Sequence, residues 1–256
     1  MKIILLGTGT TLPNRYRNAA GLIVQINEHL NDHFLLFDCG NGILRQIERA
    51  NLDFMQIRDI FISHIHADHI NDLPVLLQAN LMLQNSELIK IYGPSTIKKK
   101  IEVWLTEIYP SLDVLLNQLE IQEISGGFVI ENPNWKVQCI PVRHGTIEAY
   151  GFKIIAEKTI VYSGDTGYCE ELIQAAHDAD VLIHECPHPT SLGSEGHTTP
   201  LELGLIAQQA NIPKLVLTHF NPDCFGREQE MLSDIRRNFG GKIIFGKDLL
   251  NIDLNE

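Results

Sequence analysis

The sequence predicts an α/β fold of two similar halves, with the two sheets packed against each other and the helices outside. Short apolar runs interrupted by Gly, Asn and Pro are typical of strands, and strands followed by helices occur in each half of the chain. The 256 residues suit a single α/β domain, and 44% of them are hydrophobic, which is enough to build a sizeable core. We therefore expect one domain, residues 1–256.

The predicted strands are the short apolar runs. They cover residues 2–6, 21–26, 33–38, 58–63 and 88–92, and later 118–124, 128–131, 135–140, 149–155, 159–163, 180–184, 214–218 and 242–246. Apolar residues spaced three or four apart predict helices. These helices lie near 41–50, 69–84, 95–108, 168–177, 200–210 and 227–238.

The composition narrows the class of protein. The formal net charge is −12, and because non-specific nucleic-acid binding comes from Lys and Arg, a nucleic-acid substrate would need a local basic patch. The five scattered cysteines form no CxxC pair, which predicts reduced thiols. The first apolar run is too short for a signal peptide, and no stretch approaches the roughly 20 apolar residues of a membrane helix. We expect a cytoplasmic protein with no membrane partner.

A dense cluster of metal-ligand residues follows the predicted strand 58–63. His64, His66, Asp68 and His69 lie within six consecutive positions, where a strand end leads into a helix. Hydrophobic burial does not require such a cluster, whereas imidazole and carboxylate groups are ligands that zinc takes. Four donors exceed the three that a catalytic site with one metal usually draws from the protein. The cluster therefore indicates a pair of metal ions.

A site for two metal ions needs further ligands, and three later strands each end near one. His144, Asp165 and His219 all come after an apolar run, at the start of a loop. Active-site residues concentrate where rigid strands present loops in this way. We therefore expect these three residues to complete the metal site.

With these residues in place, the chain resembles the metallo-β-lactamase superfamily, whose fold is a four-layer αββα sandwich. The resemblance spans nearly the whole chain. It implies that one metal ion is bound by His64, His66 and His144, and the second by Asp68, His69 and His219, with Asp165 bridging both. Zinc is favoured for the two divalent ions because diiron relatives have Glu where this chain has His66, and Mn²⁺ is the alternative.

Other segments resemble ribonuclease Z in particular. The segment Gly7–Asn18 is similar to that family's glycine turn followed by a PxKxRN loop, with Arg15 in place of the usual Lys. Two cations and an amide beside a metal site can hold phosphate oxygens, so Arg15, Arg17 and Asn18 are predicted to bind the substrate. A solvated basic loop is the alternative at these positions.

Two short motifs of the same resemblance concern catalysis. His184–Cys186 is similar to the family's HEAT segment, and Gly196–Thr199 is similar to its GHST segment. The resemblance implies that His197 protonates the leaving group and that Glu185 orients this histidine or raises its pKa. Asp68, besides being a ligand, is the candidate that orients or deprotonates the attacking water.

One departure from ribonuclease Z bears on the substrate. That family inserts a long tRNA-binding arm before the bridging Asp, whereas only six residues separate Ile155 from Tyr162 in this chain. This leaves room for a hairpin turn but not for an arm. A smaller phosphodiester, such as a cyclic nucleotide or a short oligonucleotide, needs no arm.

The sequence thus predicts a dinuclear, zinc-dependent hydrolase of phosphodiester bonds, either a ribonuclease Z-like endonuclease or a small phosphodiesterase, with a nucleotide or RNA as substrate. Hydrolysis of a thioester, lactone or sulfate ester is the first alternative. A non-catalytic, metal-binding regulatory protein is the second. A homodimer is expected from the resemblance alone.

Overall fold

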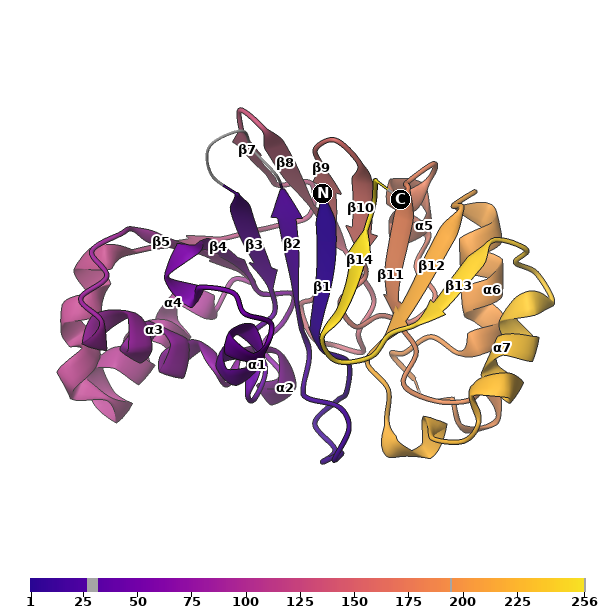
Figure 1. Cartoon of the computed structure of the whole chain (residues 1–256), viewed down its shortest axis with the longest axis horizontal. Helices are drawn as coiled ribbons and strands as arrows, with labels where there is room; N and C mark the ends of the chain where they lie inside the picture. The colour runs from indigo at the N-terminus through magenta and orange to yellow at the C-terminus, as the bar shows by residue number, and fades with distance from the viewer. Residues whose placement is uncertain (27–31, 194, 256) are drawn as a thin grey trace. The chain divides into compact units, whose positions relative to one another are not determined.

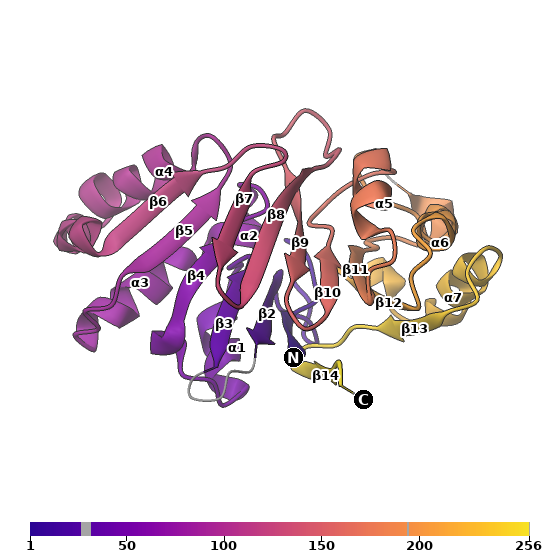
Figure 2. The same ribbon diagram turned by 90° about the horizontal axis from the view of Figure 1, so that it is seen from above.

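The computed structural model describes residues 1–26, 32–193 and 195–255, and the chain divides into two compact units. Unit 1 consists of Met1–Gly7, Asn18–Ile124 and Asp248–Glu256, and unit 2 of Thr8–Arg17 and Ser125–Lys247. Within the described residues, each unit holds a seven-stranded sheet with its own helices (Figures 1 and 2). The predicted α/β class is confirmed. The assignment of the whole chain to a single domain stays a prediction.

The sheet of unit 1 has the strand order β14-β1-β2-β3-β4-β5-β6. Its strands are β1 (Lys2–Gly7), β2 (Gly21–Ile26), β3 (His33–Phe37), β4 (Ile57–Phe61), β5 (Ile89–Gly93), β6 (Leu119–Glu123) and β14 (Leu250–Asp253). Pairing is antiparallel from β14 to β3 and parallel from β3 to β6. The helices are α1 (Ile43–Arg49), α2 (Ala67–Ile70), α3 (Leu73–Met82) and α4 (Ile97–Val103), followed by a π-helical turn (Trp104–Ile108) and a 3₁₀ segment (Pro110–Gln118). Isoleucine and leucine side chains of the sheet pack against α1, α3 and α4 and form the core.

The sheet of unit 2 has the strand order β13-β12-β11-β10-β9-β8-β7. Its strands are β7 (Val129–Asn132), β8 (Trp135–Pro141), β9 (Tyr150–Ile155), β10 (Thr159–Tyr162), β11 (Val181–Glu185), β12 (Lys214–Thr218) and β13 (Lys242–Phe245). Pairing is antiparallel from β7 to β10 and parallel from β10 to β13. The helices are α5 (Glu170–Ala176), α6 (Pro200–Gln209) and α7 (Glu228–Arg236). Each sheet therefore changes once from antiparallel to parallel pairing, as two similar halves should.

Two differences between the structure and the sequence prediction have a clear physical reason. β14 is not predicted, because it is short and pairs with β1 at the other end of the chain, which leaves no local pattern. The helix expected over 69–84 is two helices, α2 and α3. The break falls before Pro74, which has no N–H to continue a helical ladder but is favoured in the first turn of a new helix.

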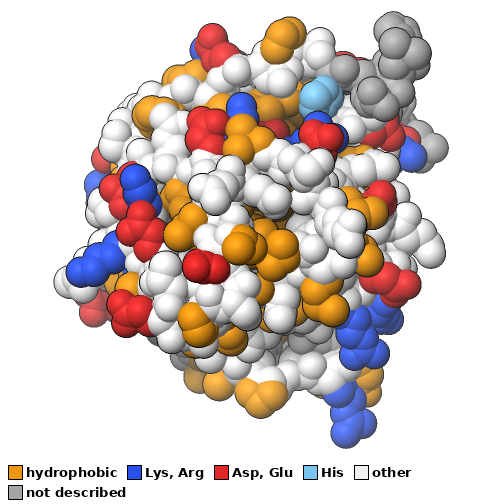
Figure 3. All heavy atoms as spheres, turned by 90° about the vertical axis from the view of Figure 1, so that its left-hand side faces the viewer, with side chains coloured by type: hydrophobic (Ala, Val, Ile, Leu, Met, Phe, Trp, Pro, Cys, Tyr) orange, Lys and Arg blue, Asp and Glu red, His pale blue; other side chains and the backbone are white. Residues whose placement is uncertain are grey.

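The surface of unit 1 carries apolar side chains on the side where α3 and α4 lie. Figure 3 views this side and shows apolar groups among charged ones. The large apolar side chains that unit 1 exposes include Met82, Leu83, Ile108 and Val114.

Among the described residues, no helix is both long and apolar enough to cross a membrane. The five cysteines are buried free thiols.

Candidate metal centre

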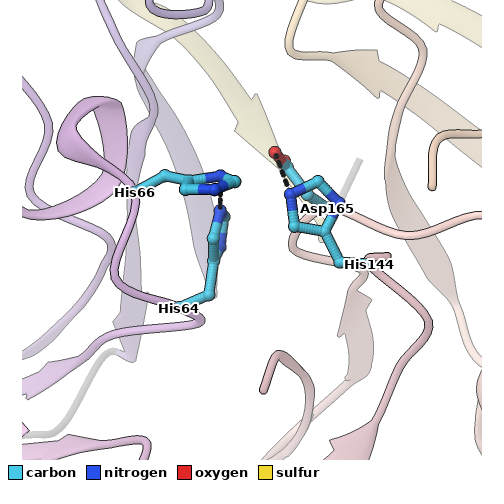
Figure 4. Close-up of side chains that lie close together, drawn as sticks. All are labelled: His64, His66, His144 and Asp165. Atoms are coloured by element: carbon cyan, nitrogen blue, oxygen red, sulfur yellow. Dashed lines mark hydrogen bonds and ion pairs between the residues drawn. The ribbon is translucent and has the colours of Figure 1, made fainter. Parts of the chain in front are cut away.

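The first histidine cluster lies in unit 1, where the chain leaves β4 and enters α2. His64 and His69 are fully buried, Asp68 is almost fully buried and His66 is half-buried. His64 Nε2 lies 3.0 Å from His66 Nδ1 (Figure 4), and His69 Nε2 lies 3.8 Å from Asp68 Oδ2. Unit 1 therefore brings together the four ligands predicted within it. The close ring nitrogens and the carboxylate are the donor types that a divalent metal takes.

A second carboxylate in unit 1, Asp38, supports this cluster. Asp38 follows β3 with a φ of 59°, a left-handed conformation that residues other than glycine seldom adopt. Its buried side chain accepts hydrogen bonds from Ser63 N at 2.8 Å and Ser63 Oγ at 2.9 Å, and its Oδ2 lies 2.8 Å from His69 Nδ1. Because Asp38 holds Nδ1, Nε2 is the nitrogen of His69 that is left to bind a metal.

The second cluster lies in unit 2 and contains the other three predicted ligands. Asp165 Oδ2 lies 3.9 Å from His144 Nε2 (Figure 4) and 3.4 Å from His219 Nε2, and all three side chains are buried. β10 and β12 run in the same direction on either side of β11, so Asp165 and His219 follow at the same edge of the sheet. His219 has a φ of 60°, another left-handed position of the kind that clusters at functional sites.

The donors in both clusters fit a divalent metal. His144 Nδ1 lies 3.0 Å from the carbonyl oxygen of Gly196, so Nδ1–H donates to it and Nε2 faces Asp165. His69 is held in the same way by a carboxylate. Metal-binding histidines usually donate their other ring N–H to a carbonyl or a carboxylate, which orients the ring and fixes its tautomer. Imidazole and carboxylate donors prepared in this way suit Zn²⁺ and similar ions.

His197 stands beside the ligands of unit 2. Its Nδ1 lies 2.8 Å from Oε1 of Glu185, a fully buried carboxyl at the end of β11. Burial, and then the charge of Asp165, raise the pKa of Glu185 well above its usual range. The ligand atoms of Asp165, His197 and His219 all lie within 4.8 Å of one another. The predicted acid and its orienting partner are therefore hydrogen-bonded to each other and close to the candidate ligands.

We predict that acid weakens the folded state through His184, which lies in β11. Burial lowers the pKa of this histidine from 6.5 to about 4. As pH falls below about 6.5, His184 binds a proton in the unfolded chain, whereas in the folded protein it stays neutral until about pH 4. The free energy of unfolding therefore drops within this window, by about 3 kcal/mol, and is restored on returning to neutral pH. Urea unfolding at several pH values measures the loss.

Two variants isolate this effect from the titration of other groups. His184→Gln should reduce the pH-dependent loss of stability, because glutamine takes up no proton. His177→Gln replaces an exposed histidine and should leave the loss unchanged. The same pH dependence in both variants and in the parent would contradict the prediction.

The three residues predicted to bind the substrate are placed differently. Arg17 is engaged within unit 2, where its Nη1 donates to Thr8 Oγ1 at 2.6 Å and to the carbonyl of Gly246 at 2.7 Å. Asn18 belongs to unit 1 and donates through Nδ2 to a backbone carbonyl there. Arg15 is exposed. Arg17 therefore fastens its loop, and Arg15 is the cation of the segment that is turned to solvent.

Two groups of the site were not among the predicted site residues, the Asp38 carboxylate and the Gly196 carbonyl. A signal existed for Asp38, because β3 pairs with β4 in parallel, so a residue just after β3 lies beside the start of the histidine cluster. No side chain marks a backbone carbonyl, so Gly196 could be found only from the structure.

Comparison with known proteins places the chain among metal-dependent hydrolases. The family model described as "Anti-Pycsar protein Apyc1" matches residues 1–234. Ribonuclease Z of Methanosarcina mazei is 30% identical over 309 aligned positions, which cover 99% of this chain and 98% of that protein. Ribonuclease Z of Bacillus cereus is 29% identical, with 93% and 95% covered. The first alignment exceeds the 256 residues of this chain, so the M. mazei enzyme contains segments that this chain lacks.

Solved structures show the same fold. The metallo-β-lactamase fold protein YhfI from Bacillus subtilis matches with a TM-score of 0.83 at 22% identity, with 98% of each chain covered. The short form of human tRNase Z matches with a TM-score of 0.78 at 24% identity, with 99% of each chain covered. The predicted metallo-β-lactamase fold is confirmed.

Proposed function

Because this chain belongs to the family described as Anti-Pycsar protein Apyc1 and to the wider group of ribonuclease Z relatives, we propose that it hydrolyses small phosphodiesters, nucleotides rather than tRNA precursors. The class of activity follows from the family: the chain is a metal-dependent phosphodiester hydrolase. The size of the substrate, the ligand assignment and the roles of single residues are the proposal.

The short turn between β9 and β10 is the observation that supports a small substrate. Ile155, at the end of β9, pairs with Thr159, at the start of β10, and Ala156 N donates to the carbonyl of Lys158 at 3.1 Å. The ribonuclease Z resemblance puts the tRNA-binding arm before Asp165, where this chain has only a tight hairpin. Without an arm to hold the body of a tRNA, binding of the substrate depends on contacts close to the phosphodiester.

Under this proposal, the metal ligands are the seven residues that the sequence predicts: His64, His66, Asp68, His69, His144, Asp165 and His219. Bound divalent ions supply positive charge against the phosphate oxygens and make an attacking water more acidic. Asp38 and the Gly196 carbonyl orient two of the histidines, so that their Nε2 atoms carry the lone pairs.

Protein side chains move the protons. His197, held by Glu185 through Nδ1, has Nε2 available to donate a proton to the leaving oxygen. Asp68 orients the attacking water, and Arg15 contributes positive charge for the phosphate. Glu185 positions His197.

A panel of substrates with the metal-loaded protein tests the proposal. We expect turnover of bis(p-nitrophenyl) phosphate and of a 3′,5′-cyclic nucleotide, and poor cleavage of a precursor tRNA. Efficient processing of the precursor tRNA would overturn the proposal that the substrate is small. Turnover of a thioester, a lactone or a sulfate ester in place of the phosphodiesters would assign a different hydrolase activity. Bound metal without any turnover would favour a regulatory protein.

The proposal also includes zinc as the bound metal, a homodimer and a cytoplasmic location. A donor set made up only of histidine and aspartate side chains supports zinc, with Mn²⁺ as the alternative. Metal analysis of the purified protein and its mass in solution test the first two, and fluorescence microscopy of the tagged protein in cells tests the third.

A further inference from the structure

Two aromatic side chains of unit 2, Tyr16 and Phe225, are exposed to solvent. Tyr16 is 65% exposed and Phe225 is 74% exposed. Their ring planes differ by 10° and their centroids are 6.0 Å apart, which is an offset stack. Neither ring belongs to the described core of unit 2. Packing of the core therefore does not account for either ring.

Each ring extends from a hydrogen-bonded turn of the backbone. Tyr16 N donates to Oδ1 of Asn14 at 2.9 Å, which closes a local turn. Phe225 N donates to the carbonyl of Pro222 at 3.2 Å, at the end of a 3₁₀ turn. The backbone that carries each ring is therefore fixed before a ligand binds, which lowers the entropic cost of binding.

The loops that carry the two rings are attached to the strand end that bears His219. Phe220 N donates to the carbonyl of Thr8 at 2.8 Å, which fastens the start of the loop that contains Tyr16. Phe225 follows His219 by six residues in the same segment. Both aromatic side chains therefore extend from segments anchored at a candidate ligand of unit 2.

We infer that the stacked pair Tyr16–Phe225 is a subsite for the nucleobase of the substrate. The inference rests on the proposed function, because a base is present only if the phosphodiester is a nucleotide. The Arg15 guanidinium carbon lies 5.9 Å from the centroid of the Tyr16 ring, so Tyr16 has Arg15 and Phe225 as neighbours, and Phe225 is the more exposed residue of the pair. Every base has a π-face, so such a platform accepts purines and pyrimidines alike.

Two substrates that share a leaving group test the subsite. Thymidine 5′-(p-nitrophenyl) phosphate and methyl p-nitrophenyl phosphate both release p-nitrophenolate, and only the first carries a base. With metal-loaded Phe225→Ala, we expect KM for the thymidine substrate to rise about tenfold, with kcat little changed. KM for the methyl substrate should stay at the parent value. Phe225→Trp restores a ring and should restore KM for the thymidine substrate.

Tyr109→Ala is the matched control, since Tyr109 is an exposed aromatic residue of unit 1. It should leave both KM values unchanged. An unchanged KM for the thymidine substrate with Phe225→Ala would overturn the subsite, and so would an equal rise for both substrates. A change in the mass of the protein in solution with KM unaltered would make the pair an interface between copies of the chain. If the parent protein turns over neither substrate, the proposed function itself fails.

Discussion

Replacing His197 with alanine is expected to lower kcat by about 10²- to 10⁴-fold and to leave the metal content unchanged. With Nδ1 bound to Glu185, Nε2 is the proton donor that the variant lacks. The loss should depend on the leaving group. A nitrophenolate departs without a proton, so bis(p-nitrophenyl) phosphate should be affected least, whereas a cyclic nucleotide, whose leaving group is an alkoxide, should be affected most. Steady-state kinetics with both substrates measures the difference.

His188→Ala is the matched control for this variant. His188 Nδ1 lies 2.7 Å from Asp223 Oδ2, and His188 is 22% exposed where His197 is 21% exposed. The two histidines are therefore matched in exposure and in contact with a carboxylate, while Asp223 is 34% exposed and Glu185 is fully buried. We expect His188→Ala to keep most of the activity. If His197→Ala instead loses a metal ion, His197 is a ligand, which its nearness to Asp165 and His219 would then explain.

The candidate metal ligands could be named from the sequence because their chemistry is local, and their binding of metal stays a prediction. His64, His66 and His69 lie within six residues, and imidazoles in such numbers are rarely needed for packing. The later candidates, His144, Asp165 and His219, could be named because each is a side chain of a metal-binding type that lies within three residues of the end of an apolar strand. The same runs of apolar residues predicted the strands, since strands in the parallel part of a sheet read as continuous hydrophobic segments.

Features that depend on contacts between distant segments could not be predicted. β14 exists because it pairs with β1, from which most of the chain separates it in sequence. The positive charge of Arg17 is visible in the sequence, but the hydrogen bond from its Nη1 to the Gly246 carbonyl is not, because it joins segments far apart in the chain. Substrate binding by Arg17 stays a prediction. Asp38 lies between the two cases, because parallel pairing of β3 with β4 places it beside the histidine cluster, but its hydrogen bonds to Ser63 and His69 depend on the register of that pairing.

Replacing Asp38 with alanine is expected to weaken metal binding by about 10- to 100-fold, although Asp38 is not a predicted ligand. The variant removes the acceptor that orients His69 through Nδ1, so the ring is free to rotate and to change tautomer. It also removes the acceptor of the buried Ser63 N, whereas Ser63 Oγ keeps His64 Nδ1 at 3.0 Å. Each buried donor left without a partner costs about 1–3 kcal/mol, so the free energy of unfolding should fall as well. Competition with a zinc-binding dye and urea unfolding measure the two effects.

The two effects of Asp38→Ala can be separated with Asp72→Ala. Asp72 is also a carboxylate of unit 1 that accepts a backbone hydrogen bond, from Leu44 N at 2.7 Å, and the bonds in which it takes part include none to an imidazole among the described side chains. Asp72→Ala should therefore lower stability but keep the metal affinity of the parent. Equal metal affinity in the two variants would mean that orientation of His69 by Asp38 contributes nothing to the site. A loss confined to Asp38→Ala would show that a residue outside the histidine cluster decides how tightly that cluster holds its metal.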